Sequence, residues 1–115
     1  MADTNKLIKK VLAFRDARDW KQFHNPKDLA ISLVLEAGEV MEHFQWKSKE
    51  EIEEYIKTHK EEISYELVDV LVYLLTMVDA LDIDIEQAFK KKMKKNAIKY
   101  PVKKSKGKHL KYNKL

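Results

Sequence analysis

The sequence contains no cysteine and very little glycine or proline. Its 115 residues include two Gly, two Pro and no Cys. The absence of Cys excludes disulfides, thiolate zinc sites and a cysteine nucleophile. The scarcity of Gly and Pro argues against a turn-rich sandwich or barrel and favours helices. No apolar run approaches the ~20 residues that a membrane-spanning helix needs, and the N-terminus lacks the apolar core of a signal peptide. We therefore expect a soluble, cytoplasmic protein with no membrane partner.

Acidic residues are absent from the C-terminal end of the chain, where the basic charge is concentrated. Residues 101–115 contain six Lys, whereas residues 1–100 carry 17 basic and 19 acidic residues. A nucleic-acid-binding domain is expected to carry its basic patch on the folded body. This body is slightly acidic, so we expect no nucleic acid on it. We divide the chain into a domain of residues 1–101 and a Lys-rich tail of residues 102–115.

Local start and stop signals predict four main helices and one short helix. Asn25-Pro26 is a helix start, with Asn as the N-cap and Pro at the first helical position. Ser48 and Glu51 have the spacing of a capping box. Tyr100-Pro101 is a stop, because the residue before Pro avoids the α region. With the spacing of apolar residues, these signals predict main helices over about residues 4–20, 26–46, 59–81 and 85–99, and a short helix over about residues 49–57.

Two of the predicted helices are too apolar to be covered by one short chain. Leu29–Val40 is very apolar, and Leu67–Ala80 is apolar around nearly its whole circumference, with Asp69 and Asp79 as the exceptions. A helix that is hydrophobic all round is buried. We therefore predict an all-α fold of the four-helix-bundle kind, assembled as a homo-oligomer.

Four carboxylates interrupt these apolar helices. They form two pairs at a spacing of three, which puts each pair on one helix face: Glu36 with Glu39, and Glu66 with Asp69. Burying an unpaired carboxylate costs several kcal/mol. No Lys or Arg lies in residues 28–46 or 61–89 to offset that cost. A divalent cation is the remaining candidate, and oxygen ligands without His or Cys nearby indicate Mg²⁺ or Mn²⁺ rather than Zn²⁺.

Two other interpretations of the carboxylates compete with this one. A single E-x-x-E on a helix is usually a solvated face, although two such pairs in apolar helices are harder to explain that way. A ferritin-like di-iron site needs Glu-x-x-His pairs, and no His here follows a Glu at that spacing. Carboxylate-bound Mg²⁺ commonly engages a substrate phosphate, so the sequence favours hydrolysis of a phosphate or pyrophosphate ester. A Gly-rich P-loop is absent, which leaves metals and Lys or Arg to hold the phosphates.

In the order of its motifs, the sequence resembles the all-α nucleoside triphosphate pyrophosphatase superfamily. Within it, the sequence is most similar to the MazG-like group and its dCTP pyrophosphatase branch. The resemblance covers about residues 6–101. The hallmark is E-x-x-E at residues 36–39, a spacer of 26 residues, and E-x-x-D at residues 66–69. The accompanying motifs are Arg18-Asp19-Trp20-x-Gln22-Phe23-His24-x-Pro26, Phe44-Gln45-Trp46-Lys47, Asp69-Val70-Leu71-x-Tyr73, Lys92-Met93-x-x-Asn96 and Tyr100-Pro101.

The resemblance implies a hydrolase that cleaves a nucleoside triphosphate between the α and β phosphates. The products would be a nucleoside monophosphate and pyrophosphate, and the substrate dCTP or a related deoxynucleotide. Mg²⁺ would be required, with Mn²⁺ able to substitute. The implied role is housecleaning of the nucleotide pool. The implied assembly is a homodimer or a dimer-of-dimers tetramer with sites between subunits.

The resemblance also implies roles for particular residues. Glu36, Glu39, Glu66 and Asp69 would bind Mg²⁺, and one of the Glu would orient or deprotonate the attacking water. Trp20, Phe23, His24, Trp46 and Tyr73 would line the nucleoside pocket, while Lys92, Asn96, Lys99 and Tyr100 would contact phosphates. Ordinary packing is the alternative for the aromatic residues, and a solvated face is the alternative for Lys92. The rival function is a helical oligomeric binding module that uses its basic tail on nucleic acid or an acidic partner.

Overall fold

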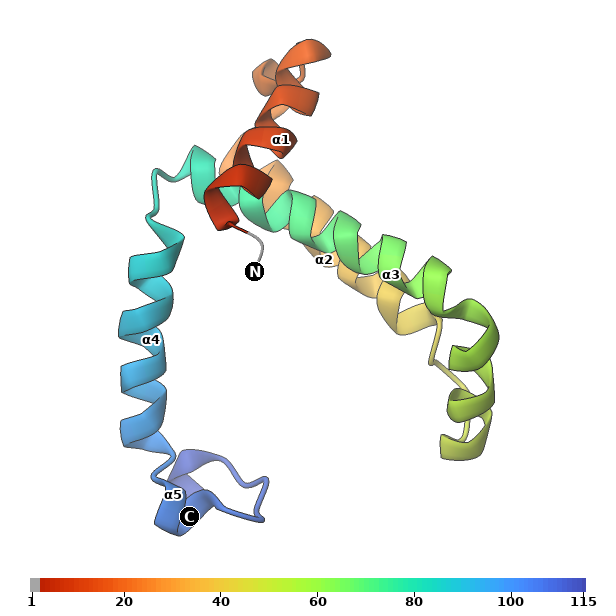
Figure 1. Cartoon of the computed structure of the whole chain (residues 1–115), viewed down its shortest axis with the longest axis vertical. Helices are drawn as coiled ribbons and strands as arrows, with labels where there is room; N and C mark the ends of the chain where they lie inside the picture. Colours follow the sequence, from red (N-terminus) through yellow and green to blue (C-terminus); the bar gives the residue numbers. More distant parts are fainter. Residues whose placement is uncertain (1–2) are drawn as a thin grey trace. The chain divides into compact units, whose positions relative to one another are not determined.

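The computed structural model describes residues 3–115, and within that range its regular structure is entirely helical (Figure 1). The four long helices are α1 (Thr4–Ala17), α2 (Pro26–Glu42), α3 (Lys49–Ala80) and α4 (Ile85–Lys99). A short helix, α5 (Val102–Ser105), and two single-turn 3-10 helices, Lys21–Phe23 and Tyr112–Lys114, complete the elements. The predicted all-α class and the four main helices are confirmed.

Each long helix begins where a side chain accepts a hydrogen bond from an unsatisfied backbone N–H of the first turn. The cap of α3 is a full capping box, because Ser48 accepts from the Glu51 N–H and Glu51 accepts from the Ser48 N–H. The other caps are Asp3, which accepts from Asn5, Asn25, which accepts from Asp28 and is followed by Pro26, and Asp84, which accepts from Gln87.

The predicted break near residue 58 is wrong, because α3 is one continuous helix of 32 residues. The hydroxyl of Thr58 donates to the carbonyl of Tyr55, and the ring of His59 lies 3.1 Å from the same carbonyl. These bonds stay inside the helix and cap nothing. No Gly or Pro lies in residues 49–80 to interrupt the backbone ladder.

α1 and α2 end earlier than predicted. α1 stops at Ala17 and α2 at Glu42, and in both loops a nearby residue has the left-handed conformation that leaves a helix. These residues are Asp19, with φ of 54°, and Trp46, with φ of 67°. Such a conformation costs a bulky L-residue about 1–2 kcal/mol, and periodicity of apolar residues does not reveal it.

The contacts divide the chain into two compact units, Met1–Asp82 and Ile83–Leu115. In the first unit α2 and α3 form an antiparallel hairpin, and α1 packs on α3 (Figure 1). The core of this unit is small: among its described residues, 3–82, three apolar side chains are buried, Leu29, Leu75 and Val78. Buried Arg15 bonds Asp16 at 2.8 Å and lies 3.4 Å from Asp79, which ties α1 to α3.

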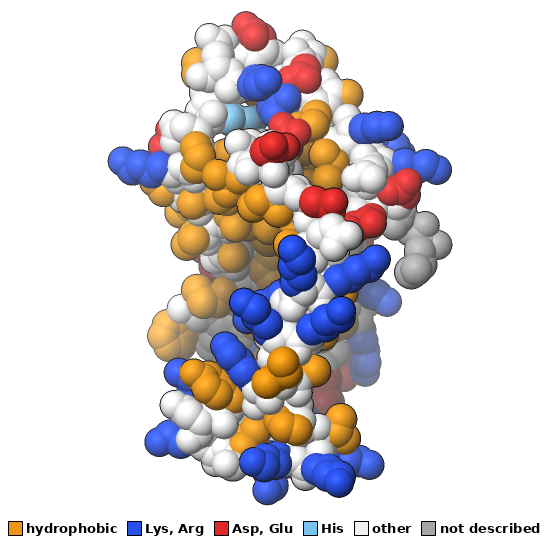
Figure 2. Space-filling model, turned by 90° about the vertical axis from the view of Figure 1, so that its left-hand side faces the viewer, with side chains coloured by type: hydrophobic (Ala, Val, Ile, Leu, Met, Phe, Trp, Pro, Cys, Tyr) orange, Lys and Arg blue, Asp and Glu red, His pale blue; other side chains and the backbone are white. Residues whose placement is uncertain are grey.

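Large apolar side chains of α2 and α3 remain exposed, and hydrophobic side chains gather on the face seen in Figure 2. Val34 is 70% exposed and Leu35 64%. Contiguous apolar surface of this kind is typical of an interface. The homo-oligomer would cover it and stays a prediction.

The second unit is strongly basic. It carries twelve Lys and only two acidic residues, and Lys side chains dominate the lower part of Figure 2. Within it, the ring of Tyr112 contacts Tyr100 edge-on, and Lys99 Nζ lies 4.9 Å from the Tyr112 ring centre. The boundary between a domain of residues 1–101 and a tail of residues 102–115 stays a prediction. None of the described helices has the length and apolar character needed to cross a bilayer.

Candidate functional site

α2 and α3 bring the predicted carboxylates into one electrostatic neighbourhood. The Glu36 carboxyl is half-buried, and its pKa is raised above the usual value. Burial is the largest cause, followed by the adjacent Glu39 and by the negative charges of Asp69 and Glu66. The charges of Glu39, Glu66 and Asp69 therefore all influence the Glu36 carboxyl, although the four residues come from two helices.

No lysine or arginine among residues 3–115 neutralises these carboxylates. Within residues 3–115, no Lys or Arg forms an ion pair with any of the four. One oxygen of Glu36, Oε2, is buried without a hydrogen-bond partner. A buried carboxylate oxygen without a donor is costly, which makes this atom a candidate ligand for a cation.

The donor set fits a hard divalent ion. The four groups supply only carboxylate oxygens, which Mg²⁺ and Mn²⁺ accept. In the part of the chain that the structure describes, however, no three Asp, Glu or His side chains converge as a ready-made metal cage. Mg²⁺ commonly uses one or two protein carboxylates and completes its shell with water and substrate phosphate oxygens. Carboxylates that line one region without forming a complete coordination shell are compatible with Mg²⁺ binding of this kind.

A histidine lies against one of these carboxylates, contrary to the expectation that no His is nearby. His43 Nε2 lies against Glu66 Oε2, and His43 Nδ1 lies 2.5 Å from the Tyr55 hydroxyl. The pKa of Tyr55 is raised, first by burial and then by Glu62 and Glu66, so its phenol stays protonated. Sequence spacing places His43, just after α2, on the same side as Glu36 and Glu39, seven and four residues after them, but it gives no signal for the contact with Glu66 on α3.

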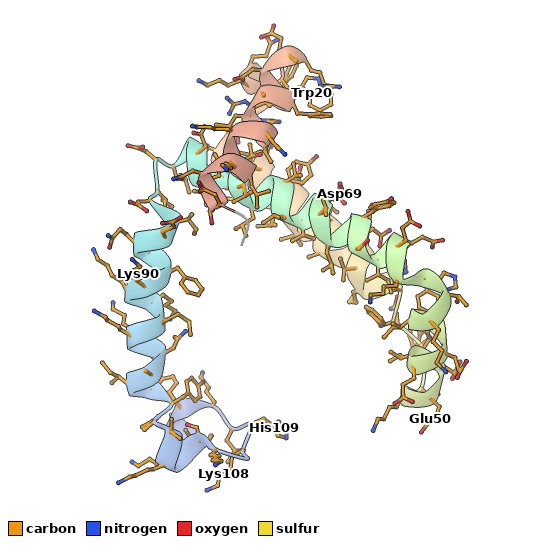
Figure 3. The ribbon with its side chains drawn as sticks, in the orientation of Figure 1. Trp20, Glu50, Asp69, Lys90, Lys108 and His109 are labelled. Atoms are coloured by element: carbon orange, nitrogen blue, oxygen red, sulfur yellow. The ribbon has the colours of Figure 1, made fainter. Side chains whose placement is uncertain are left out.

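A cavity of about 510 Å³ lies beside the carboxylates. Glu36 and Asp69 line it together with three residues of the predicted nucleoside pocket, Trp20, His24 and Tyr73. Figure 3 shows Trp20 beyond the end of α1 and Asp69 on α3. The cavity therefore joins aromatic and acidic side chains from three segments of the first unit.

The loop after α1 is folded so that Trp20 and His24 can reach the cavity. Asp19 turns the chain through its positive φ, and the Trp20 N–H then donates to the Arg15 carbonyl at 3.1 Å. The Trp20 ring packs edge-on against the Phe14 ring, with the two ring centres 5.8 Å apart. Trp20 keeps 44% of its surface exposed. His24 Nδ1 is buried and has no hydrogen-bond partner. The loop thus offers a stacking face and a free polar atom.

Side chains of α1 also line this cavity, and the predicted set of pocket residues did not include them. The remaining lining residues are Lys10, Val11, Phe14, Arg15, Val72 and Thr76. Four of them share one face of α1, at the i, i+1, i+4, i+5 spacing of a helix, and this periodicity was the available signal.

Six of the nine predicted substrate-binding residues are not among the residues that line this cavity, and neither are the predicted metal ligands Glu39 and Glu66. Phe23 is 66% exposed and Trp46 is 91% exposed. The four predicted phosphate contacts belong to the second unit, three on α4 and one directly after it: Lys92, Asn96, Lys99 and Tyr100. The roles of these six residues stay predictions.

The chain matches proteins of one family over most of its length. The model of the MazG-like family matches residues 31–115. dCTP pyrophosphatase 1 of Mus musculus is 42% identical over 104 residues, and that of Homo sapiens is 36% identical. These alignments cover 89% of this chain and 61% of each relative, so the chain spans about three fifths of the relatives' length.

A solved structure agrees with these matches. The crystal structure of a pyrophosphatase from Archaeoglobus fulgidus is 40% identical and superposes with a TM-score of 0.80. The match covers 88% of this chain and 94% of that one. On the family model and this structural likeness together, the chain belongs to the MazG-like family.

Proposed function

We propose that the chain is a Mg²⁺-dependent nucleoside triphosphate pyrophosphohydrolase. It cleaves between the α and β phosphates and gives a nucleoside monophosphate and pyrophosphate. The observation that carries the proposal is the cavity in which Trp20, His24 and Tyr73 meet Glu36 and Asp69. The relatives named dCTP pyrophosphatase favour dCTP or a related deoxynucleotide as substrate, and clearance of surplus nucleotides as the role.

The nucleoside end of the substrate occupies the aromatic part of the cavity. A base stacked on an aromatic face gains roughly 1–3 kcal/mol, and Trp20 presents such a face. His24 Nδ1 is available for a hydrogen bond to the base or sugar. Val11 lines the same cavity and offers none, so selectivity for one base depends on His24 and on the Tyr73 hydroxyl.

The carboxylates serve the phosphate end. Glu36, Glu39, Glu66 and Asp69 hold the divalent cation, for which Mn²⁺ can substitute. Bound there, the ion would neutralise phosphate charge and lower the pKa of a coordinated water. One of the three Glu carboxylates orients or deprotonates the attacking water.

Cations for the triphosphate come from two places. Lys10 lines the cavity, whereas Arg15 is engaged by Asp16 and Asp79. Lys92, Asn96, Lys99 and Tyr100 contribute donors from the second unit. The assembly is a homodimer or a dimer of dimers, in which a second copy covers the exposed apolar face of α2 and α3 and completes the site.

A substrate panel with Mg²⁺ tests the proposal. Each nucleoside and deoxynucleoside triphosphate is incubated with the protein, and monophosphate, pyrophosphate and orthophosphate are separated chromatographically. We expect monophosphate and pyrophosphate in equal amounts. Asp69→Asn should reduce kcat/KM by at least about 100-fold, the upper range for loss of an outer-shell partner of a metal. Glu53→Gln, at an exposed carboxylate on the same helix, is the control and should retain full activity. Release of orthophosphate would contradict cleavage between the α and β phosphates.

A further inference from the structure

Two residues that contact the carboxylate region, His43 and Tyr55, have no role in the proposed function. His43 follows the last residue of α2, and only 11% of its side chain is exposed. Its two ring nitrogens face different partners, Glu66 through Nε2 and the Tyr55 hydroxyl through Nδ1. The three residues line a cavity of about 230 Å³ together with Glu39 and Glu42. The imidazole therefore bridges the cap of α2 to two positions on α3.

The two ring nitrogens face partners of different kinds. With the Tyr55 O–H donating to Nδ1, the ring proton is on Nε2, the nitrogen that lies against Glu66 Oε2. A carboxylate can only accept, so this tautomer places an N–H against Glu66. The contact does not have the geometry of a hydrogen bond, because Glu66 Oε2 is buried without a hydrogen-bond partner.

The Tyr55 side chain is itself fixed. The Tyr55 ring stacks on His59 with centroids 3.9 Å apart and planes 5° apart. Lys47 Nζ lies 4.4 Å from the centre of the Tyr55 ring. A hydroxyl carried by a ring that is packed in this way holds the imidazole at a defined angle. The packed Tyr55 ring therefore holds the His43 ring in place, and the His43 ring in turn holds the Glu66 side chain.

The consequence concerns the free oxygen of Glu66. Contact with His43 restricts the rotamers of the Glu66 side chain. Its Oε2 is buried without a hydrogen-bond partner, which makes this oxygen a candidate ligand for a cation, as Glu36 Oε2 is. Outer-shell donors of this kind orient metal ligands, and their loss typically reduces metal affinity about 10–100-fold. We propose that His43, held by Tyr55, is a positioning residue that orients the Glu66 carboxylate toward a divalent cation. The inference rests on the proposed function only in taking Glu66 as a metal ligand.

Binding of Mn²⁺ in the absence of nucleotide tests this role directly. The metal-free chain of residues 1–115 is titrated with Mn²⁺, and free Mn²⁺ is measured by electron paramagnetic resonance. His43→Leu should weaken Mn²⁺ binding by about 10–100-fold. His43→Gln keeps an N–H donor for Glu66 and should recover most of the affinity. His109→Leu makes the same exchange at an exposed residue of the second unit and should bind Mn²⁺ like the unmodified protein. Equal affinity in His43→Leu and the unmodified protein would overturn the proposal.

Two further measurements separate positioning from a general loss of structure. At saturating Mn²⁺, His43→Leu should regain kcat, because Glu66 is still present, while the Mn²⁺ concentration for half-maximal rate rises by the same factor as the dissociation constant. If His43→Leu does not fold, the tautomer in the unmodified metal-free protein decides. Nitrogen-15 correlation spectra of its His rings should show the His43 proton on Nε2, and a proton on Nδ1 alone would overturn the link to Glu66.

The outcomes distinguish this inference from the proposed function. If the unmodified protein binds Mn²⁺ through a His43-dependent site but cleaves no triphosphate, the proposed function fails and the positioning role stands. If it cleaves a triphosphate and His43→Leu leaves both Mn²⁺ affinity and the Mn²⁺ dependence of the rate unchanged, the positioning role fails alone.

Discussion

At the scale of single residues, the site contains carboxylates that are partly buried although no hydrogen-bond donor of residues 3–115 compensates their burial. Glu36 lies near three other acids and keeps one oxygen buried without a donor. Its type and position on α2 could be predicted from spacing alone. The contact between His43 and Glu66 could not, because it depends on how far α3 runs back along α2 after the turn. Sequence spacing gives the face of one helix and not the register between two.

Replacing Glu36 by Gln should stabilise the metal-free protein at neutral pH. Folding raises the pKa of this carboxyl above its ordinary value of 4.5. The charged form is therefore penalised in the folded state, and stability is lost as pH rises from the ordinary value through the raised one. Glu36→Gln removes the penalty. Urea unfolding at pH 7 should show higher stability than the unmodified protein, with the difference vanishing below the ordinary pKa.

In the presence of Mg²⁺, the unmodified protein should become more stable to unfolding than Glu36→Gln. A cation bound to Glu36 favours its charged form, so Mg²⁺ should raise the unfolding midpoint of the unmodified protein. Glu36→Gln should gain much less. Glu53→Gln, at an exposed position of α3, serves as the control for loss of one negative charge. An equal gain from Mg²⁺ in Glu36→Gln would mean that Glu36 does not bind the ion.

At the scale of elements, local chemistry made the helix starts predictable. Asn25-Pro26, the Ser48–Glu51 box and Asp84 each cap a helix as their sequences indicate. Helix ends were less predictable, because the chain leaves α1 and α2 through left-handed backbone conformations at Asp19 and Trp46. Residue type does not predict these conformations. The continuous α3 was missed because Thr58 resembles a cap in sequence but bonds within the helix.

The capping box should contribute measurably to stability. Ser48→Ala removes the acceptor for the Glu51 N–H and should cost about 1 kcal/mol of unfolding free energy. Ser64→Ala is the matched control on the same helix, since its hydroxyl donates to the Glu61 carbonyl within the helix. That change should stay within about 0.5 kcal/mol in urea titrations. Equal losses in the two variants would show that the box does not anchor α3.

At the scale of the whole molecule, charge separates the two units. The second unit holds twelve of the 23 Lys and Arg residues and only two of the 19 acidic ones. The Lys-rich tail was predictable from composition, whereas the division of contacts at Asp82 was not. Composition records which charges are present, but the division depends on which helices pack together.

Removing the tail separates the enzyme from the rival binding module. Deleting residues 102–115 should lower kcat/KM less than tenfold, because the carboxylates and the aromatic cavity lie in the first unit. Glu39→Gln should lower kcat/KM by at least about 100-fold. The opposite ranking, with activity lost on deletion and kept in Glu39→Gln, would favour a function carried by the basic tail.

The central claim is that carboxylates of α2 and α3 hold a divalent cation next to a nucleoside cavity. Phosphorus-31 NMR of dCTP incubated with the protein tests it most directly, with Mg²⁺ present and then removed by a chelator. The account predicts signals of dCMP and pyrophosphate that stop growing when Mg²⁺ is removed. Accumulation of dCDP and orthophosphate, or hydrolysis that continues unchanged after chelation, would contradict it.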